Sequence, residues 1–322
     1  MYILDTDVLQ PGDIVLTTQD RKISKGIRRL TGSSFSHALL YVARGSYIHS
    51  DGSGVHANNT QRLLFAHQAH ALALRLVRHE HRDARPRICD FARSQVGKQY
   101  SISQAIASRK HRSGSGGLRE NRQFCSRLVA QSFAAADIAL VGNPDFCYPT
   151  DLFNSDFVAP VADAVREATP AEMAFARTPS PLEAQAAATN RMLQAIRGLA
   201  REDVQNEEQL VALLLRRPEL DLAAVHALQD SGYLELWRLE VAANPWRYEE
   251  GAYAASLPPE ARLQEIASAD GLLERFVRMR SIYAALAKQA PLKYFAMQLG
   301  LHDRLIALQS RRRMVMTAAG RP

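Results

Sequence analysis

The sequence has only three cysteines and no long apolar run. Cys89, Cys125 and Cys147 form no Cys-x-x-Cys pair in 322 residues, which argues against a disulfide-built scaffold and against a thiolate zinc site. The uncharged, mostly apolar stretch 128–136 is far shorter than the ~18 apolar residues that a membrane-spanning helix requires. We therefore expect no transmembrane segment and at least one free thiol.

The first residues also lack the basic segment and the following apolar segment of a secretory signal peptide. We therefore expect the chain to be cytoplasmic at synthesis. A signal-independent export route remains open.

Charge is unevenly distributed between the two halves of the chain. The net charge is +7, and residues 1–160 contain 20 basic and 13 acidic side chains, whereas residues 161–322 contain 20 of each. A positive first half favours an anionic substrate or peripheral contact with an anionic membrane. The excess is modest and no basic stripe alternates with aromatic residues, so we expect no nucleic-acid partner.

The length and composition indicate two globular domains. With 47% hydrophobic and 23% charged residues the chain can build a core, and single cores rarely grow beyond ~250 residues. Prolines at positions 170, 179 and 181 mark a shift in composition. We therefore predict a first domain over 1–168, a Pro-rich linker over 169–181 and a helical domain over 182–322, whose role the sequence does not indicate.

Short apolar runs bounded by Gly, Asp and Ser predict a small sheet in the first domain. The predicted strands are Asp13–Thr17, Ala38–Val42, Tyr47–His49 and Ala71–Leu76, and the predicted helices are Ile88–Val96 and Ser126–Ala136. The second domain shows only helical patterns, with predicted helices over 182–200, 205–217, 220–243, 258–289 and 291–312. The expected fold is therefore α+β, followed by an all-α domain.

Cys125 lies where the predicted helix of residues 126–136 starts. A thiol in the first turn is close to unpaired N–H groups and to the positive end of the helix dipole, which stabilise a thiolate and lower its pKa. Cys125 is therefore a candidate nucleophile. The alternative is a small, inert, buried side chain, which suits Cys89 and Cys147 better.

His37 and His49 are the two histidines that lie beside predicted strands. A three-residue loop of residues 43–45 between these strands would pair residue 37 with 51 and make His49 a diagonal neighbour of His37 on the same face. A two-residue turn would place the two rings on opposite faces. Gly45 suits the left-handed position of the longer loop, which we therefore prefer. On a shared face, one histidine can act as a general base and the other can orient it. The alternative is that the two histidines are unrelated.

The other histidines give no comparable pattern. His67 and His70 could share a helical face, but no acidic or thiolate ligand accompanies them, so no metal site is predicted there. Residues 108–122 are basic, rich in Gly and Ser and without periodicity, which predicts a loop.

Six short motifs then occur in order. They are Leu9-Gln10-Pro11-Gly12-Asp13, Ser36-His37-Ala38-Leu39, Tyr47-Ile48-His49-Ser50, Gly97-Lys98-Gln99-Tyr100, Phe124-Cys125-Ser126-Arg127 and Tyr148-Pro149-Thr150-Asp151-Leu152. This order, over about residues 8 to 160, resembles the circularly permuted NlpC-like papain-fold cysteine hydrolases, a group that contains the YiiX-like bacterial enzymes and is related to lecithin retinol acyltransferase. The resemblance implies a permuted papain-like first domain, in which the histidine precedes the cysteine.

The resemblance also implies roles for single residues. Cys125 corresponds to the nucleophile, His37 to the base and His49 to the orienting group, with Ser50 and Asp51 as its nearest polar substitutes. Several YiiX-like enzymes have a glutamate at this third position, whereas the acyltransferase branch has a second histidine. Tyr100 matches a tyrosine of the family, which implies a substrate-binding residue, with a core aromatic as the alternative. The basic loop, and not the resemblance, adds Arg109, Lys110 and Arg112 as expected substrate-binding residues.

These roles imply acyl transfer through a thioester, a reaction that requires no metal or organic cofactor. The first hypothesis is a hydrolase or acyltransferase acting on lipid acyl esters, of phospholipase A type, favoured by His49 and by the positive first domain. The second is a peptidoglycan or peptide amidase, including a bacterial effector exported without a signal peptide. The third is a non-catalytic protein that binds a protein partner through its helices.

Overall fold

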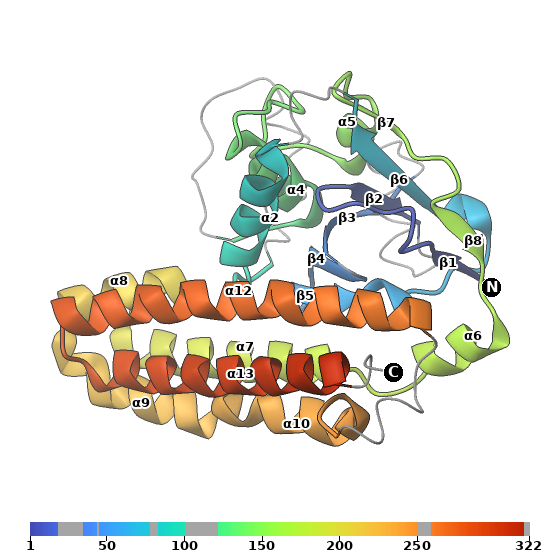
Figure 1. The fold of residues 1–322 in the computed structure, drawn as a ribbon. Coiled ribbons are helices and arrows are strands. Elements are labelled where there is room, and N and C mark those ends of the chain that lie inside the picture. Colours follow the sequence, from blue (N-terminus) through green and yellow to red (C-terminus); the bar gives the residue numbers. More distant parts are fainter. Residues whose placement is uncertain (19–34, 44, 78–82, 101–121, 250–258, 319–322) are drawn as a thin grey trace. The chain divides into compact units, whose positions relative to one another are not determined.

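The structure is a computed structural model that describes residues 1–18, 35–43, 45–77, 83–100, 122–249 and 259–318. The chain forms two compact units (Figure 1). The first contains Met1–Ala186 together with Gln205–Glu208, and the second contains Ala187–Val204 and Gln209–Pro322. Each unit has its own apolar core.

A six-stranded antiparallel sheet forms the centre of the first unit. In spatial order its strands are β5 (Gly54–Asn59), β4 (Ser46–Asp51), β3 (His37–Ala43), β2 (Ile14–Thr17), β6 (Ala71–Leu76) and β7 (Val158–Pro160). Successive side chains of a strand point to opposite faces. Leu16 and Leu40 therefore belong to the core on one face, and Val15, Leu39 and Tyr41 to the core on the other.

Helices α2 (Arg85–Ser94) and α4 (Cys125–Ala134) cover one of these faces (Figure 1). Ile88 of α2 and Leu128 of α4 are fully buried in the same core as Leu16 and Leu40. The remaining elements of the first unit are short. They are β1 (Tyr2–Leu4) and β8 (Val165–Glu167), which pair with each other, η1 (Thr60–Arg62), η2 (Gln68–His70), α5 (Pro149–Phe153) and α6 (Pro170–Ala176).

The strands and helices predicted for the first domain are confirmed, with their ends shifted by at most three residues. Strands β1, β5, β7 and β8 were not predicted. In β5 only Val55 and Ala57 are apolar, so the alternation that indicates a strand is too short to identify it. β7 is a three-residue edge strand that ends in a proline, and such strands give little signal.

Most of the β3–β4 hairpin has the register predicted for a three-residue loop. Its end has the pairing expected for the two-residue turn. Leu39 pairs with His49, which is the register of the three-residue loop. At the tip Ala43 pairs with Ser46, as in the two-residue turn, and a β-bulge beside Ala43 shifts the register back. Gly45 is left-handed, with a φ of 77°. The bulge therefore brings the two histidines to the same face.

The C-terminal region is helical, as predicted. Its helices are α7 (Pro181–Ala200), α8 (Glu207–Arg216), η4 (Pro218–Leu220), α9 (Asp221–Asp230), η5 (Tyr233–Glu235), α10 (Leu236–Ala243), η6 (Pro245–Arg247), α12 (Pro259–Gln289) and α13 (Lys293–Ala318). α12 and α13 lie side by side (Figure 1). Leu193, Leu210, Leu228 and Tyr294 are among the buried residues of this core.

Several helix boundaries differ from the prediction, and the last helix ends at Ala318 instead of residue 312. The single helix expected over 220–243 is divided into α9 and α10, because Gly232 is left-handed with a φ of 77° and so ends the helix before it. The expected linker 169–181 contains α6, which starts with Pro170 in its first turn. No helix in the described part of the chain is both long and apolar enough to cross a bilayer.

Candidate active site

Cys125 is the first residue of α4. Phe124 before it is extended, with φ −133° and ψ 165°, so the helix begins at the cysteine. Cys125 is 8% exposed, and the backbone N–H groups of Ala38 and Ser126 lie close enough to its sulfur to stabilise the charged form. The sulfur therefore lies against β3, next to the residue that follows His37.

β3 and β4 stop pairing at the end where Cys125 lies. Their last pair is Leu39 with His49. Beyond it, the N–H of Ala38 meets the sulfur, and Ser50 Oγ donates to the carbonyl oxygen of Gln123 at 3.2 Å. Both residues thus contact the segment that starts α4, which fixes the cysteine against the strands that contain the histidines.

Burial raises the pKa of the Cys125 thiol, and the hydrogen bonds to its sulfur offset this effect only in part. The expectation of a lowered pKa is therefore wrong for the resting chain. The cost of removing a thiolate from water outweighs the stabilisation at the helix start. The thiol stays neutral until a base takes its proton.

Three histidines form a hydrogen-bonded chain across β3, β4 and β5. His37 Nε2 lies 2.9 Å from His49 Nδ1, and His49 Nε2 lies 2.9 Å from His56 Nε2. His56 Nδ1 in turn lies 3.2 Å from the carbonyl oxygen of Gly54. The structure therefore brings together His37 and His49, as predicted, and adds His56 to them.

The Gly54 carbonyl at the end of this chain fixes the positions of its protons. A carbonyl only accepts hydrogen bonds, so a neutral His56 carries its proton on Nδ1 and accepts from His49 through Nε2. His49 then carries its proton on Nε2 and accepts from His37 Nε2 through Nδ1. This leaves Nδ1 of His37 unprotonated, as a general base requires.

The surroundings keep the first two rings neutral. Burial lowers the pKa of His37 to about 4, an effect that Asp51 opposes and His56 reinforces. Burial and the neighbouring His37 and His56 also hold the pKa of His49 well below its usual value. At neutral pH both rings are therefore uncharged.

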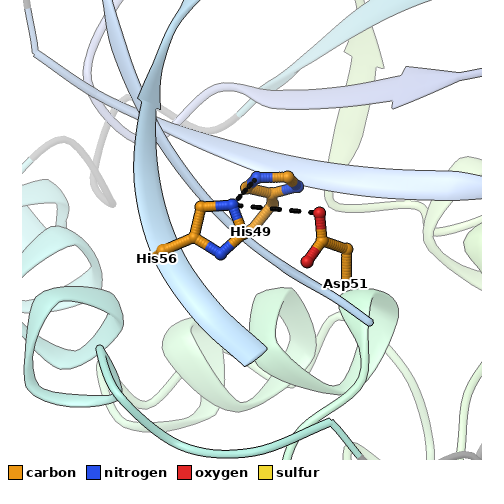
Figure 2. Close-up of side chains that lie close together, drawn as sticks. All are labelled: His49, Asp51 and His56. Atoms are coloured by element: carbon orange, nitrogen blue, oxygen red, sulfur yellow. Dashed lines mark hydrogen bonds and ion pairs between the residues drawn. The ribbon is translucent and has the colours of Figure 1, made fainter. Parts of the chain in front are cut away.

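Asp51 lies at the end of β4, beside the last histidine (Figure 2). Its Oδ2 is 3.8 Å from His56 Nε2, and its Oδ1 accepts a hydrogen bond from the Ser53 N–H at 2.8 Å. The Asp51 side chain is 43% exposed, so the buried chain of rings reaches the surface here. His49, Asp51 and His56 are also the described side chains whose ligand atoms are close enough to share a metal ion.

Tyr100, a predicted substrate contact, lies near the site. Burial and the charges of Cys125 and Asp51 raise its pKa. Arg109, Lys110 and Arg112, the other predicted contacts, fall with their basic loop outside the described residues.

Neither of the other two cysteines starts a helix, although the carbonyl oxygen of Cys147 accepts a hydrogen bond from Ser126 Oγ, beside Cys125, at 2.7 Å. Cys89 is within α2 and Cys147 precedes α5, and burial raises the pKa of both thiols. His67 and His70 form a separate pair at η2, with ring centroids 4.9 Å apart. None of these four residues joins the histidine chain.

His56 is the site residue that the sequence interpretation missed. It pairs directly with His49 across β4 and β5, so recognition of β5 as a strand would have identified it. The turn Asp51-Gly52-Ser53-Gly54 was the available signal, because Gly and Asp in that spacing favour a hairpin.

Comparison with known proteins gives one family. Residues 8–178 match the family described as permuted papain-like amidase enzyme, YaeF/YiiX, C92 family. No curated protein matches the chain significantly. Among solved structures, the chain is similar to the metalloprotein YiiX from Escherichia coli O157:H7, with 18% identity, a TM-score of 0.36, and coverage of 48% of this chain and 96% of that chain.

The family match spans more than half of the 322 residues and includes Cys125, His37, His49 and His56. It confirms the YiiX-like, permuted papain-like character of the first domain. The chain belongs to the C92 family of permuted papain-like amidases.

Proposed function

We propose that this chain hydrolyses an amide bond of a peptide or of peptidoglycan, with Cys125 as nucleophile, His37 as general base and His49 as the group that orients the base. Membership of the amidase family supports a cysteine-type hydrolase. The observation that carries the proposal is the hydrogen-bonded chain that leaves Nδ1 of His37 unprotonated on the strand against which Cys125 lies.

The proposed reaction begins from a neutral pair. His37 Nδ1 takes the thiol proton as the Cys125 sulfur attacks the carbonyl carbon, and the N–H of Cys125 at the helix start stabilises the oxyanion. The imidazolium of His37 donates more strongly to His49 Nδ1 than the neutral ring does, which stabilises the charge. It then protonates the leaving amine, and a thioester remains. Water, deprotonated by His37, releases the acyl group and restores the thiol.

A lipid acyl ester is the second candidate substrate. It is favoured by the second histidine at position 49, which hydrogen-bonds His37 at 2.9 Å, and by the net charge of +7, all of it in residues 1–160. The thioester chemistry is the same for both candidates. They differ in the bond attacked and in the acceptor, which is water for a hydrolase and an amine or alcohol for an acyltransferase.

The test is incubation of the full chain with muropeptides and with glycerophospholipids in water enriched in oxygen-18, followed by mass spectrometry. An amidase yields a new amine and a carboxylate labelled with oxygen-18. Released, labelled fatty acid with intact muropeptides would assign the lipid candidate instead.

Variants identify the nucleophile. Cys125→Ala should abolish turnover and the thioester adduct, and His37→Ala should lower kcat by roughly 10²–10⁴. Cys89→Ala is the matched thiol control and should retain activity. A chain that consumes neither substrate class, with a thiol that His37→Ala does not affect, would contradict the proposal and favour a protein that binds a partner.

A further inference from the structure

One end of the histidine chain meets a carboxylate (Figure 2). The ligand atoms of His49, Asp51 and His56 lie within 4.8 Å of one another. His49 Nε2 and His56 Nε2 are 2.9 Å apart, and Asp51 Oδ2 is 3.8 Å from His56 Nε2. Two imidazoles and one carboxylate are a donor set typical of zinc, with water as a fourth ligand.

The distances between these ligand atoms fit a zinc ion after small movements of the side chains. Bonds of ~2.0–2.1 Å in a tetrahedral site place ligand atoms ~3.3 Å apart. The two histidine nitrogens must therefore separate by a few tenths of an ångström, and the carboxylate must move inward. Asp51 can move in this way because its side chain is 43% exposed and lies at the turn of the β4–β5 hairpin.

The turn between β4 and β5 also orients two of the three ligands. The Ser53 N–H holds Asp51 Oδ1 at 2.8 Å, which leaves Oδ2 for an ion. The Gly54 carbonyl accepts from His56 Nδ1, which leaves His56 Nε2 as the ligand nitrogen. Hydrogen bonds of this kind fix ligand orientation in known metal sites.

We propose that His49, Asp51 and His56 bind a zinc ion that switches the hydrolase off. The second half of this statement rests on the proposed function, and the first half does not. Zinc occupies Nε2 of His49, so the proton of that ring moves to Nδ1 and is donated to His37 Nε2. His37 must then carry its own proton on Nδ1, the atom that would accept the thiol proton.

Protons balance in this switch. Before and after zinc binds, each of the three neutral rings carries one proton, and His56 keeps its proton on Nδ1 toward Gly54. Only the positions on His49 and His37 change. Zinc therefore removes the lone pair of the base without contact with Cys125.

Binding is tested on the full chain without substrate. Zn²⁺ is titrated against a chromophoric chelator, and Co²⁺ is added as a spectroscopic substitute. We expect one ion per chain, with an affinity that falls by about tenfold or more in Asp51→Asn and in His56→Ala. The isosteric Asp51→Asn keeps the test decisive if the alanine variant folds poorly. His67→Ala, in the other histidine pair, and Cys125→Ala should bind as the unchanged chain does.

Two outcomes would overturn the site. One is unchanged affinity in both Asp51→Asn and His56→Ala. The other is loss of binding in Cys125→Ala, with a sulfur-to-cobalt charge-transfer band in the unchanged chain, which would place the ion on the thiol.

Inhibition tests the switch. The Zn²⁺ concentration that halves hydrolysis should rise by about tenfold or more in Asp51→Asn, relative to the metal-free rate of that variant. Zinc that binds without inhibition would overturn the switch. A chain that binds zinc at these residues but hydrolyses nothing would support the site and contradict the proposed function, so the two failures are distinguishable.

Discussion

The proposed mechanism starts from a neutral Cys125 thiol and a neutral His37 imidazole. Burial raises the pKa of the thiol and lowers that of the imidazole to about 4, so both shifts oppose proton transfer in the resting chain. Oxidants react with thiolates far more readily than with thiols. The resting site is therefore protected from oxidation, and charge separation is deferred until a substrate carbonyl is attacked.

The role of His56 can be measured separately from its position. His56→Ala removes the acceptor of the His49 Nε2 proton, so the tautomer of His49 is no longer fixed. We expect kcat to fall by about tenfold with little change in KM. His56→Gln should recover part of the loss, because an amide oxygen can accept the same proton. Steady-state kinetics check this, with the exposed His226→Ala as control, and equal losses in both His56 variants would contradict a positioning role.

At this scale the sequence predicted one contact and missed the next. The His37–His49 contact followed from the hairpin register, because side chains alternate along a strand. His56 could not be predicted in the same way, since β5 contains few apolar residues. The pKa of Cys125 was predicted in the wrong direction because burial of the helix start depends on packing against β3, which local sequence does not show.

At the scale of elements, the turn of the β4–β5 hairpin requires a glycine at position 54. Gly54 has a φ of 101°, and a Cβ atom there would lie 2.6 Å from the carbonyl oxygen of Lys98. Gly54→Ala should therefore lower the free energy of unfolding by at least ~1–2 kcal/mol and, since the Gly54 carbonyl orients His56, also reduce kcat. Thermal unfolding and kinetics measure both effects. Gly52→Ala is the matched control, because nothing lies within 4 Å of its added Cβ.

The start of α6 gives a second prediction for an element. Glu172 accepts from the Arg166 guanidinium and the Thr169 N–H, and Arg166 is the main reason that the pKa of Glu172 falls to about 2. A lowered pKa in the folded chain stabilises it above about pH 4.5, and this contribution disappears as the pH falls toward 2. Glu172→Gln should cost about 1 kcal/mol at neutral pH.

Urea unfolding at several pH values checks this difference. The unchanged chain should lose more stability between pH 4.5 and pH 2 than Glu172→Gln does. The exposed Glu183→Gln should behave as the unchanged chain. A pH-independent difference between the chain and Glu172→Gln would refute the assignment.

Element types followed from the sequence more reliably than element boundaries. Periodicity predicted the central strands and both covering helices, because their buried faces require it. The break at Gly232 was missed because one glycine within an apolar pattern does not reveal its φ. The helix α6 was missed because the prolines around it were interpreted as a linker, although Pro170 also suits a first helical turn.

On the scale of the whole molecule, the two units do not divide the chain at a single point. Gln205–Glu208 belongs to the first unit although residues on both sides of it belong to the second. Gln205 is fully buried, and its Oε1 accepts from the Gln99 N–H at 2.8 Å. No local pattern in the sequence predicts that Gln205–Glu208 belongs to the first unit, because this depends on a hydrogen bond between residues far apart in the chain.

The contribution of the hydrogen bond between Gln205 and Gln99 can be tested in the full chain. Gln205→Ala leaves the Gln99 N–H without this acceptor, which costs ~0.5–1.5 kcal/mol. Hydrogen exchange of the Gln99 amide should then accelerate by roughly two- to tenfold. The exposed Gln229→Ala should leave that amide unchanged. Exchange at Gln99 that is equally slow in both variants would show that the bond contributes nothing.

The outer edge of the sheet has a consequence for how a substrate approaches. β5 is the edge strand, and at Val55 its N–H and carbonyl already pair with Lys98 and Gly97, at 2.8 and 2.9 Å. A peptide that binds by adding a strand needs such groups free. Because these groups of Val55 are already paired, a peptide cannot add a strand to β5 beside the histidines. A polypeptide substrate must therefore present its scissile bond to Cys125 without extending the sheet at that point.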